Sequence, residues 1–110
     1  RTPIKTIIYS NTPLPADAAN LLDGLITGRA VQLFYGPTST YKLVEVHAIN
    51  PTHARVMQVD GESSRPLPNW ALLDLSKVQS AALTDIPSEA PRPGYRQGDK
   101  HLPNIIAELP

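Results

Sequence analysis

Apolar and polar residues alternate in short runs between Gly28 and Thr84, and turns rich in Gly or Pro separate the runs. Successive side chains of a β-strand point to opposite faces, so alternation of this kind indicates strands with one buried face. The runs predict five strands, at residues 30–35, 41–49, 54–59, 70–73 and 78–83. Trp70 to Leu73 is the shortest of them, because Pro66 and Pro68 before it cannot donate ladder hydrogen bonds.

The predicted strand at residues 41–49 has one clearly apolar face. Val44, Val46 and Ala48 share that face, which we expect to be buried. The opposite face mixes apolar and polar side chains, namely Tyr41, Leu43, Glu45, His47 and Ile49. We therefore expect this second face to be only partly covered.

The connections between the predicted strands are too short to hold a crossover helix, which parallel pairing would need. Antiparallel neighbours are expected instead, in a mainly β domain built as a small, partly open barrel of about five strands. Closure of this kind also reduces the exposed strand edges. A two-sheet sandwich is the alternative, although five short strands are few for two sheets.

One helix is predicted at about residues 15–27. Pro15 suits the first helical turn, where its missing N–H is not needed, and Asp17 is favoured near the positive end of the helix dipole. Gly24 weakens the helix by about 1 kcal/mol relative to Ala, and Gly28 is a suitable stop. An apolar stripe follows helical spacing at Leu14, Ala18, Leu21, Leu22 and Leu25. This stripe is expected to cover one open end of the barrel or to pack on another subunit.

The two ends of the chain have different patterns. Residues 4–9 form a short, β-branched apolar run that predicts a strand joining the sheet. Residues 1–84 are thus expected to form the barrel domain, and the Pro-rich residues 85–110 an extended arm. Ile105, Ile106 and Leu109 need an apolar surface, either this barrel or a neighbouring chain. A homo-oligomer would form through these residues or through the helix.

The amino-acid composition limits the classes of binding partner that we expect. Ten basic and ten acidic residues cancel, which removes the usual electrostatic case for a dedicated nucleic-acid or membrane-surface protein. The chain has no Cys, which is compatible with a reducing compartment, and no apolar run approaches the ~20 residues of a spanning helix. We expect a cytoplasmic protein without a membrane partner. A start at Arg1 rather than Met suggests a processed chain or one domain of a longer protein.

No pattern in the sequence points to catalysis. His47, His53 and His101 lack the spacing of a metal site, and there is neither a Gly-x-Ser-x-Gly motif nor a glycine-rich phosphate loop. Acidic residues on the predicted strands and turns, such as Glu45 and Asp74, are expected to be solvated. We therefore expect no enzyme activity, no cofactor and no metal.

Cationic residues come from separate parts of the strand pattern, and a small barrel can bring them to one face, where they would attract a phosphate or carboxylate. They are Lys42, Arg55, Arg65 and Lys77. Trp70, the only Trp, would supply a stacking surface for a base. The alternative is that Trp70 fills the core and the cations are ordinary surface residues.

A helix followed by residues 28–35, 42–47 and 73–78 in this order resembles the WYL domain, over about residues 16–83. This bacterial family has a small SH3/Sm-like barrel and is usually attached to a DNA-binding helix-turn-helix domain. The resemblance implies a ligand-sensing or nucleic-acid-binding module in transcription regulation.

In this resemblance Glu45 and His47 match the segment before the family's signature strand, and Lys77 matches a basic residue that the family places just before a β-branched one. The Trp-Tyr-Leu signature itself is absent, because Ala54-Arg55-Val56 occupies its strand. An expected Pro is replaced by Val46, and an expected Arg by Asp74. The family's architecture is thus the firmer implication, and its pocket the weaker one.

Together these patterns predict a non-catalytic regulatory barrel that binds an anionic ligand or single-stranded nucleic acid. The residues expected to bind it are Lys42, His47, Arg55, Arg65, Trp70 and Lys77. The alternative is a protein–protein assembly module without a small ligand.

Overall fold

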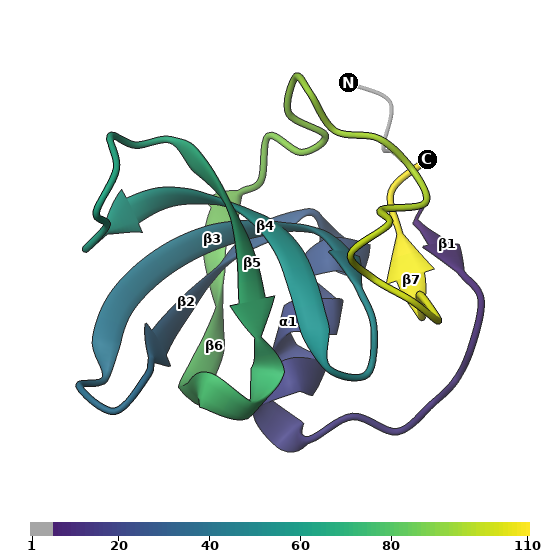
Figure 1. Ribbon diagram of the computed structural model, residues 1–110, viewed down its shortest axis with the longest axis horizontal. Coiled ribbons are helices and arrows are strands. Elements are labelled where there is room, and N and C mark those ends of the chain that lie inside the picture. Colours follow the sequence, from purple (N-terminus) through teal and green to yellow (C-terminus); the bar gives the residue numbers. More distant parts are fainter. Residues whose placement is uncertain (1–5) are drawn as a thin grey trace.

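Over residues 6–110 the structure is mainly β, with one α-helix and a single antiparallel sheet of seven strands (Figure 1). The computed structural model describes residues 6–110. The elements are β1 Ile7–Ile8, α1 Ala16–Thr27, β2 Arg29–Tyr35, β3 Thr40–Ile49, β4 His53–Gly61, β5 Asn69–Asp74, the 3-10 helix η1 Leu75–Lys77, β6 Val78–Pro87 and β7 Ala107–Glu108. The prediction of a mainly β, antiparallel fold is confirmed.

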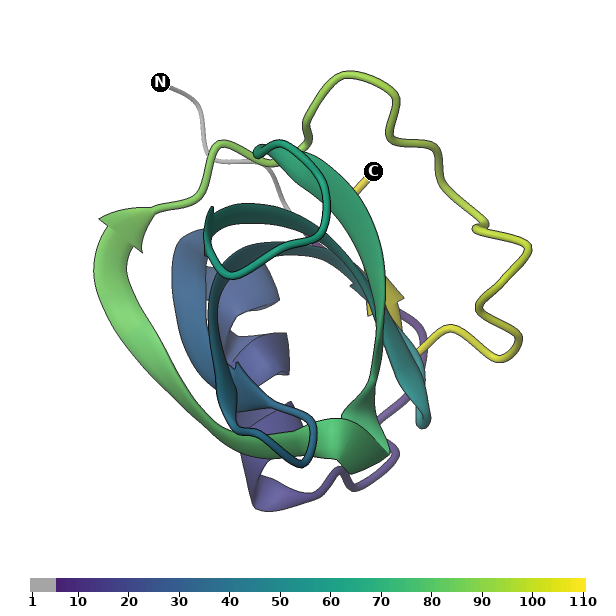
Figure 2. The same ribbon diagram turned by 60° about the vertical axis from the view of Figure 1, so that its left-hand side comes forward.

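The five longer strands follow one path through the sheet, in the order β6–β2–β3–β4–β5. Figure 2 shows how strongly this path curls. Its two ends, β5 and β6, do not pair with each other in the described part of the chain, so the sheet is not closed into a barrel. The sheet has seven strands rather than about five, because each end of the chain adds a strand of two residues.

These two short strands extend one edge of β3. β2 pairs with residues 40–44 of β3, and β7 pairs with Ala48 and Ile49 farther along the strand. β1 then pairs with β7. The strand predicted at residues 4–9 is observed at Ile7–Ile8, and the first part of that prediction lies outside the described residues.

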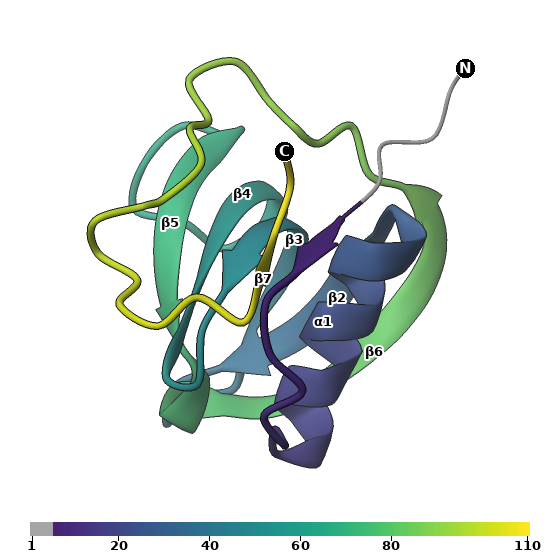
Figure 3. The ribbon, with the colours of Figure 1, turned by 90° about the vertical axis from the view of Figure 1, so that its right-hand side faces the viewer.

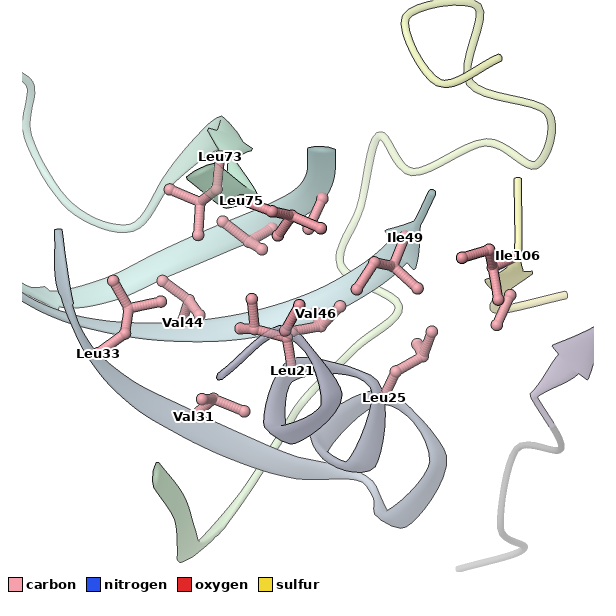
Figure 4. Close-up of a cluster of buried hydrophobic side chains, with 14 of the residues drawn as sticks. Leu21, Leu25, Val31, Leu33, Val44, Val46, Ile49, Leu73, Leu75 and Ile106 are labelled. Atoms are coloured by element: carbon pink, nitrogen blue, oxygen red, sulfur yellow. The ribbon is translucent and has the colours of Figure 1, made fainter. Parts of the chain in front are cut away.

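Helix α1 packs inside the curled sheet, against β2, β3 and β6. Its buried side chains Ala18, Leu21 and Leu25 meet the apolar faces of the strands in one core (Figure 4). Gly28 ends the helix with φ 70°, and its N–H donates to the Gly24 carbonyl. A left-handed residue at this position is a common helix stop, and glycine adopts it without steric cost.

Gly24 is the point of closest approach between α1 and β2. A Cβ at this position would lie 2.3 Å from Val31 Cγ2 and 3.0 Å from the Arg29 carbonyl oxygen. The sequence pattern counted Gly24 as a weakness of the helix, whereas the structure shows that its missing side chain permits the contact. Packing rather than helix propensity therefore explains why a glycine occupies this position.

We expect Gly24→Ala to lower the free energy of unfolding by about 1–3 kcal/mol, because the added methyl group overpacks the core. Helix propensity alone predicts the opposite sign, a gain of about 1 kcal/mol. Urea denaturation measures the difference. The control is Asp23→Ala on the exposed face of α1, for which we expect a change below about 0.5 kcal/mol. A more stable Gly24→Ala protein would contradict this account of the contact.

The second face of β3 is covered more fully than predicted, and from Leu43 onward it is buried. Glu45 is 3% exposed and His47 is completely buried. The reason is the C-terminal arm, residues 88–110, which crosses the outer face of β5, β4 and β3 on its way to β7 (Figure 3). The pattern of a single strand does not show what a distant segment will cover.

The arm lies against its own chain in this structure. Leu102, Ile106 and Leu109 are buried, and Ile105 is half-buried. The arm begins at Ser88 rather than at residue 85, since β6 extends to Pro87. The apolar residues that were expected to need a surface thus have one in the sheet and helix of the same chain.

Candidate functional site

A groove lies between the arm and the outer face of β4 and β5. Arg55 of β4 and Trp70 of β5 line one side, and arm residues 94–101 line the other. The groove has a volume of about 560 Å³. We call it the Trp70 groove, and its size is within the range of pockets that hold one small ligand.

The Trp70 side chain has a fixed position in this groove. Its ring packs edge-on against the buried His47 ring, with 4.7 Å between centroids, and His47 also contacts Tyr95 at 5.3 Å. On its other side the indole Nε1 lies 3.4 Å from where a Cβ of Gly94 would be. Trp70 remains partly exposed, so part of its aromatic side chain lines the groove.

The charges around the groove are unequal. Three cationic side chains, Arg55, Arg96 and Lys100, line it with one carboxylate, that of Asp99. Arg55 Nε donates to Asp99 Oδ2 at 2.7 Å. Arg96 and Lys100 are exposed, and neither forms an ion pair with any residue in the range 6–110. The groove therefore favours an anion.

Asp99 stays ionised beside these cations. Burial opposes its charge, but hydrogen bonds from Arg55 and from the His101 N–H outweigh this and hold the pKa of Asp99 below its ordinary value. The Arg55–Asp99 pair also ties the arm to β4, with side chains 21% and 13% exposed. This pair holds in place the part of the arm around Asp99 that lines the groove.

A second set of contacts holds the arm just before the residues that line the groove. The Glu45 carboxylate accepts hydrogen bonds from Arg92 Nε at 2.7 Å, from Arg92 Nη2 at 3.3 Å and from the Glu89 backbone N–H at 2.9 Å. His47 Nε2 accepts from the Arg92 backbone N–H at 3.0 Å. We call Glu45, His47 and Arg92 the arm latch. Glu45 was expected to be solvated, and that prediction is wrong because the arm covers it.

The contacts of His47 define its charge state. Nδ1 lies 2.9 Å from the Glu45 carbonyl oxygen, which can only accept, whereas Nε2 faces an N–H that can only donate. The ring is therefore neutral, with its proton on Nδ1. Burial, the largest effect, lowers the pKa of His47, and Arg92 adds to this, while the Glu45 carbonyl and carboxylate act in the opposite direction.

The structure divides the residues that were predicted to bind a ligand. Arg55 and Trp70 meet in the Trp70 groove, but Lys42 and Lys77 line a separate groove of about 530 Å³ beside the β2–β3 turn. Arg65 is exposed in the β4–β5 loop and lines neither groove. The four cations that were expected to share one face thus do not line one groove.

His47 was also predicted to bind a ligand, but it does not line the groove. Its ring is buried behind Trp70 with both nitrogen atoms in hydrogen bonds to the protein. It can act on the groove only through Trp70 and the arm. The interpretation that Trp70 fills the core is not supported either, since Trp70 lies on the outer face and is partly exposed.

Sequence reasoning missed the arm residues of the groove. The arm has no strand or helix period, so its side chains could not be assigned to a face. One signal was available: three cations, Arg92, Arg96 and Lys100, precede the buried Leu102 and Ile106. A charged segment that leads into apolar anchors is held near the surface of the domain, and its charges are then part of that surface.

Comparison of the chain with protein-family models, curated proteins and solved structures finds no match. Within the described residues no helix is long and apolar enough to span a membrane, and no three acidic or histidine side chains form a metal-binding group.

Proposed function

We propose that this chain is a non-catalytic binding module that holds a small anionic ligand with a flat ring in the Trp70 groove. One observation carries the proposal: the only Trp of the chain lies in one groove with Arg55, Arg96 and Lys100, opposed by one carboxylate. A nucleotide has the required combination of ring and anion.

Each part of such a ligand has a partner of suitable chemistry. Stacking of a base on an aromatic side chain contributes about 1–3 kcal/mol. Arginine presents a planar fork of donors that fits phosphate and carboxylate oxygens, and lysine adds a mobile charge. Because Arg55 is held by Asp99, its guanidinium is oriented before a ligand arrives, which lowers the entropic cost of binding.

The proposal includes the SH3/Sm-like architecture and the resemblance to the WYL domain. Helix α1 followed by a four-strand antiparallel meander, β2 to β5, with β6 returning to pair with β2, is the feature that favours this proposal. A regulatory role would then follow from coupling of the groove to a DNA-binding domain elsewhere in a longer protein. In this proposal the anionic ligand is the signal, and the present chain is its receptor.

Fluorescence of Trp70 tests the proposal directly, because no other Trp contributes to the signal. We expect adenosine monophosphate to change this emission in a saturable way, and binding to weaken as salt rises. The double variant Arg96→Ala/Lys100→Ala should bind at least tenfold more weakly. Lys42→Ala/Lys77→Ala, which removes the same charge from the other groove, is the matched control and should stay within twofold of wild type.

Further probes separate the possible ligands. Inorganic phosphate that competes at the same concentration as adenosine monophosphate would show that the ring adds nothing and that Trp70 is not a binding surface. A short oligo-dT that binds far more tightly than the mononucleotide would favour single-stranded nucleic acid. No change with any probe, together with a melting temperature that depends on protein concentration, would overturn the proposal in favour of an assembly module.

A further inference from the structure

We infer that pH controls the Trp70 groove through the arm latch. Neutral His47 holds in place the part of the groove wall that begins at Gly94 of the arm, and protonated His47 releases it. The inference depends on the proposed function only for the identity of the ligand. The latch itself is a property of the fold. It uses residues that the groove does not present to a ligand.

The hydrogen bonds of His47 allow only one charge state. In the neutral ring the bare Nε2 accepts from the Arg92 backbone N–H at 3.0 Å, and Nδ1–H donates to the Glu45 carbonyl at 2.9 Å. A second proton must go to Nε2, where it would point at the Arg92 N–H. Two donors would then face each other in a buried site, and the bond that anchors the arm would be lost.

No neighbouring group can accept a hydrogen bond from the added proton of His47. On β3 the Glu45 carboxylate is already bonded to Arg92 and to the Glu89 N–H. On the arm the Arg92 guanidinium repels a second cation, and Tyr95 stays a neutral phenol because burial raises its pKa. From β5 only the uncharged Trp70 ring contacts His47. The imidazolium would therefore lack a free acceptor.

The position of Arg92 connects this event to the groove. Gly94 is two residues farther along and lies over the Trp70 indole, and the groove wall continues from there. The far part of the wall has separate ties, since Asp99 bonds Arg55 and the Gly98 N–H donates to Glu108. Loss of the latch would thus free the segment around residues 89–94, while Tyr95, whose hydroxyl donates to the Leu109 carbonyl at 2.7 Å, and the rest of the arm stay attached.

The sign of the pH dependence follows from the lowered pKa of His47. At pH above about 6.5, the ordinary value for histidine, the ring is neutral in both the latched and the released state, and the latch is at full strength. Below that pH the released state binds a proton more readily, so the latch weakens until the pH reaches the lowered pKa of the latched state. Mild acid should therefore open the groove.

The experiment follows the Arg92 amide, because its N–H bonds directly to His47. Hydrogen exchange of this amide, corrected for the intrinsic effect of pH, should accelerate by up to about tenfold between pH 7.5 and pH 5.5, the limit for a released-state pKa near 6.5, while the amides of β2 and β3 stay protected. The variant His47→Gln has a carbonyl that can accept from the Arg92 N–H and does not titrate, so its exchange should not change with pH. His53→Gln, at the β3–β4 turn, is the matched control and should behave as wild type.

A direct measurement keeps the test decisive if His47→Gln does not fold. The imidazole carbon and proton shifts of wild-type His47 report its tautomer and its titration. The inference is overturned if the ring carries its proton on Nε2, or if it titrates with no change at the Arg92 amide. It is also overturned if the variant retains the full pH dependence of wild type.

These measurements need no ligand, so they can be distinguished from a test of the proposed function. Protonation of the phosphate weakens the binding of adenosine monophosphate to both proteins at pH 5.5. A loss of affinity that is up to about tenfold larger for wild type than for His47→Gln supports regulation of the groove. Equal loss in the variant overturns it and leaves the proposed function standing. A latch that titrates in a protein without affinity for the nucleotide removes the proposed function instead.

Discussion

Replacing Arg92 with Ala should lower the free energy of unfolding by about 3 kcal/mol, because it leaves a buried carboxylate without its counter-charge. Glu45 is 3% exposed and receives two of its three hydrogen bonds from the Arg92 side chain. The Glu89 N–H alone would remain. We place the loss at the lower end of the range for broken buried pairs, since the Arg92 side chain is 22% exposed and water can enter in its place. Chemical denaturation at pH 7.5 measures it.

Two variants show whether the buried charge is responsible. Glu89→Gln removes the other carboxylate that Arg92 contacts, but this carboxylate is 70% exposed, so the change should stay below about 0.5 kcal/mol. Adding Glu45→Gln to Arg92→Ala removes the unpaired charge and should recover part of the loss. If Arg92→Ala costs no more than Glu89→Gln, Glu45 is not a stabilising partner of the arm.

The strands were predictable because their pattern is local. Alternation at Val44 and Val46, and turn residues such as Asn50-Pro51, specify where a strand runs and ends without reference to the rest of the chain. The five strands predicted between residues 30 and 83 are accordingly all observed, each with one to four additional residues, whereas the strand predicted at residues 4–9 is only Ile7–Ile8 within the described residues. Strand ends extend beyond the pattern because ladder hydrogen bonds continue into polar residues, as at Asp60 and Gly61.

The covered face of β3 was not predictable in the same way. Glu45 and His47 alternate with valines, as solvent-facing residues do, and only the arm, more than forty residues later in the chain, makes them buried. Gly24 is a similar case, because its role depends on the approach of Val31 rather than on the helix. Local sequence specifies which face a side chain shares, and tertiary contacts decide what covers that face.

In the candidate site, too, some features follow from the local sequence and others depend on tertiary contacts. Trp70 and Arg55 were selected for their chemistry, and they do line one groove. Lys42 and Lys77 have the same chemistry but lie in another groove, because assigning them to one face required the curl of the sheet. The opposite wall comes from an arm without periodicity. Residues of suitable chemistry can thus be identified from a sequence, but whether they meet in one site depends on the fold.

Ile106→Ala should lower the free energy of unfolding by about 2–5 kcal/mol, the range for large-to-small changes in a closed core. Ile106 is 1% exposed and packs beside Ile49 and Leu25 (Figure 4). Its backbone N–H donates to the Ile49 carbonyl, and its carbonyl accepts from the Tyr9 N–H, so the substitution removes core packing without removing these bonds. The loss is measurable by urea denaturation.

The neighbouring residue provides the control, because Ile105 is only half-buried and Ile105→Ala should cost under about 1 kcal/mol. If the arm lies on its own chain in solution, both variants and wild type should unfold at a midpoint independent of protein concentration. A midpoint that rises with concentration would show that the arm stabilises a neighbouring copy instead. In that case each Trp70 groove would take one wall from another molecule, and the Arg96 and Lys100 charges would act between subunits.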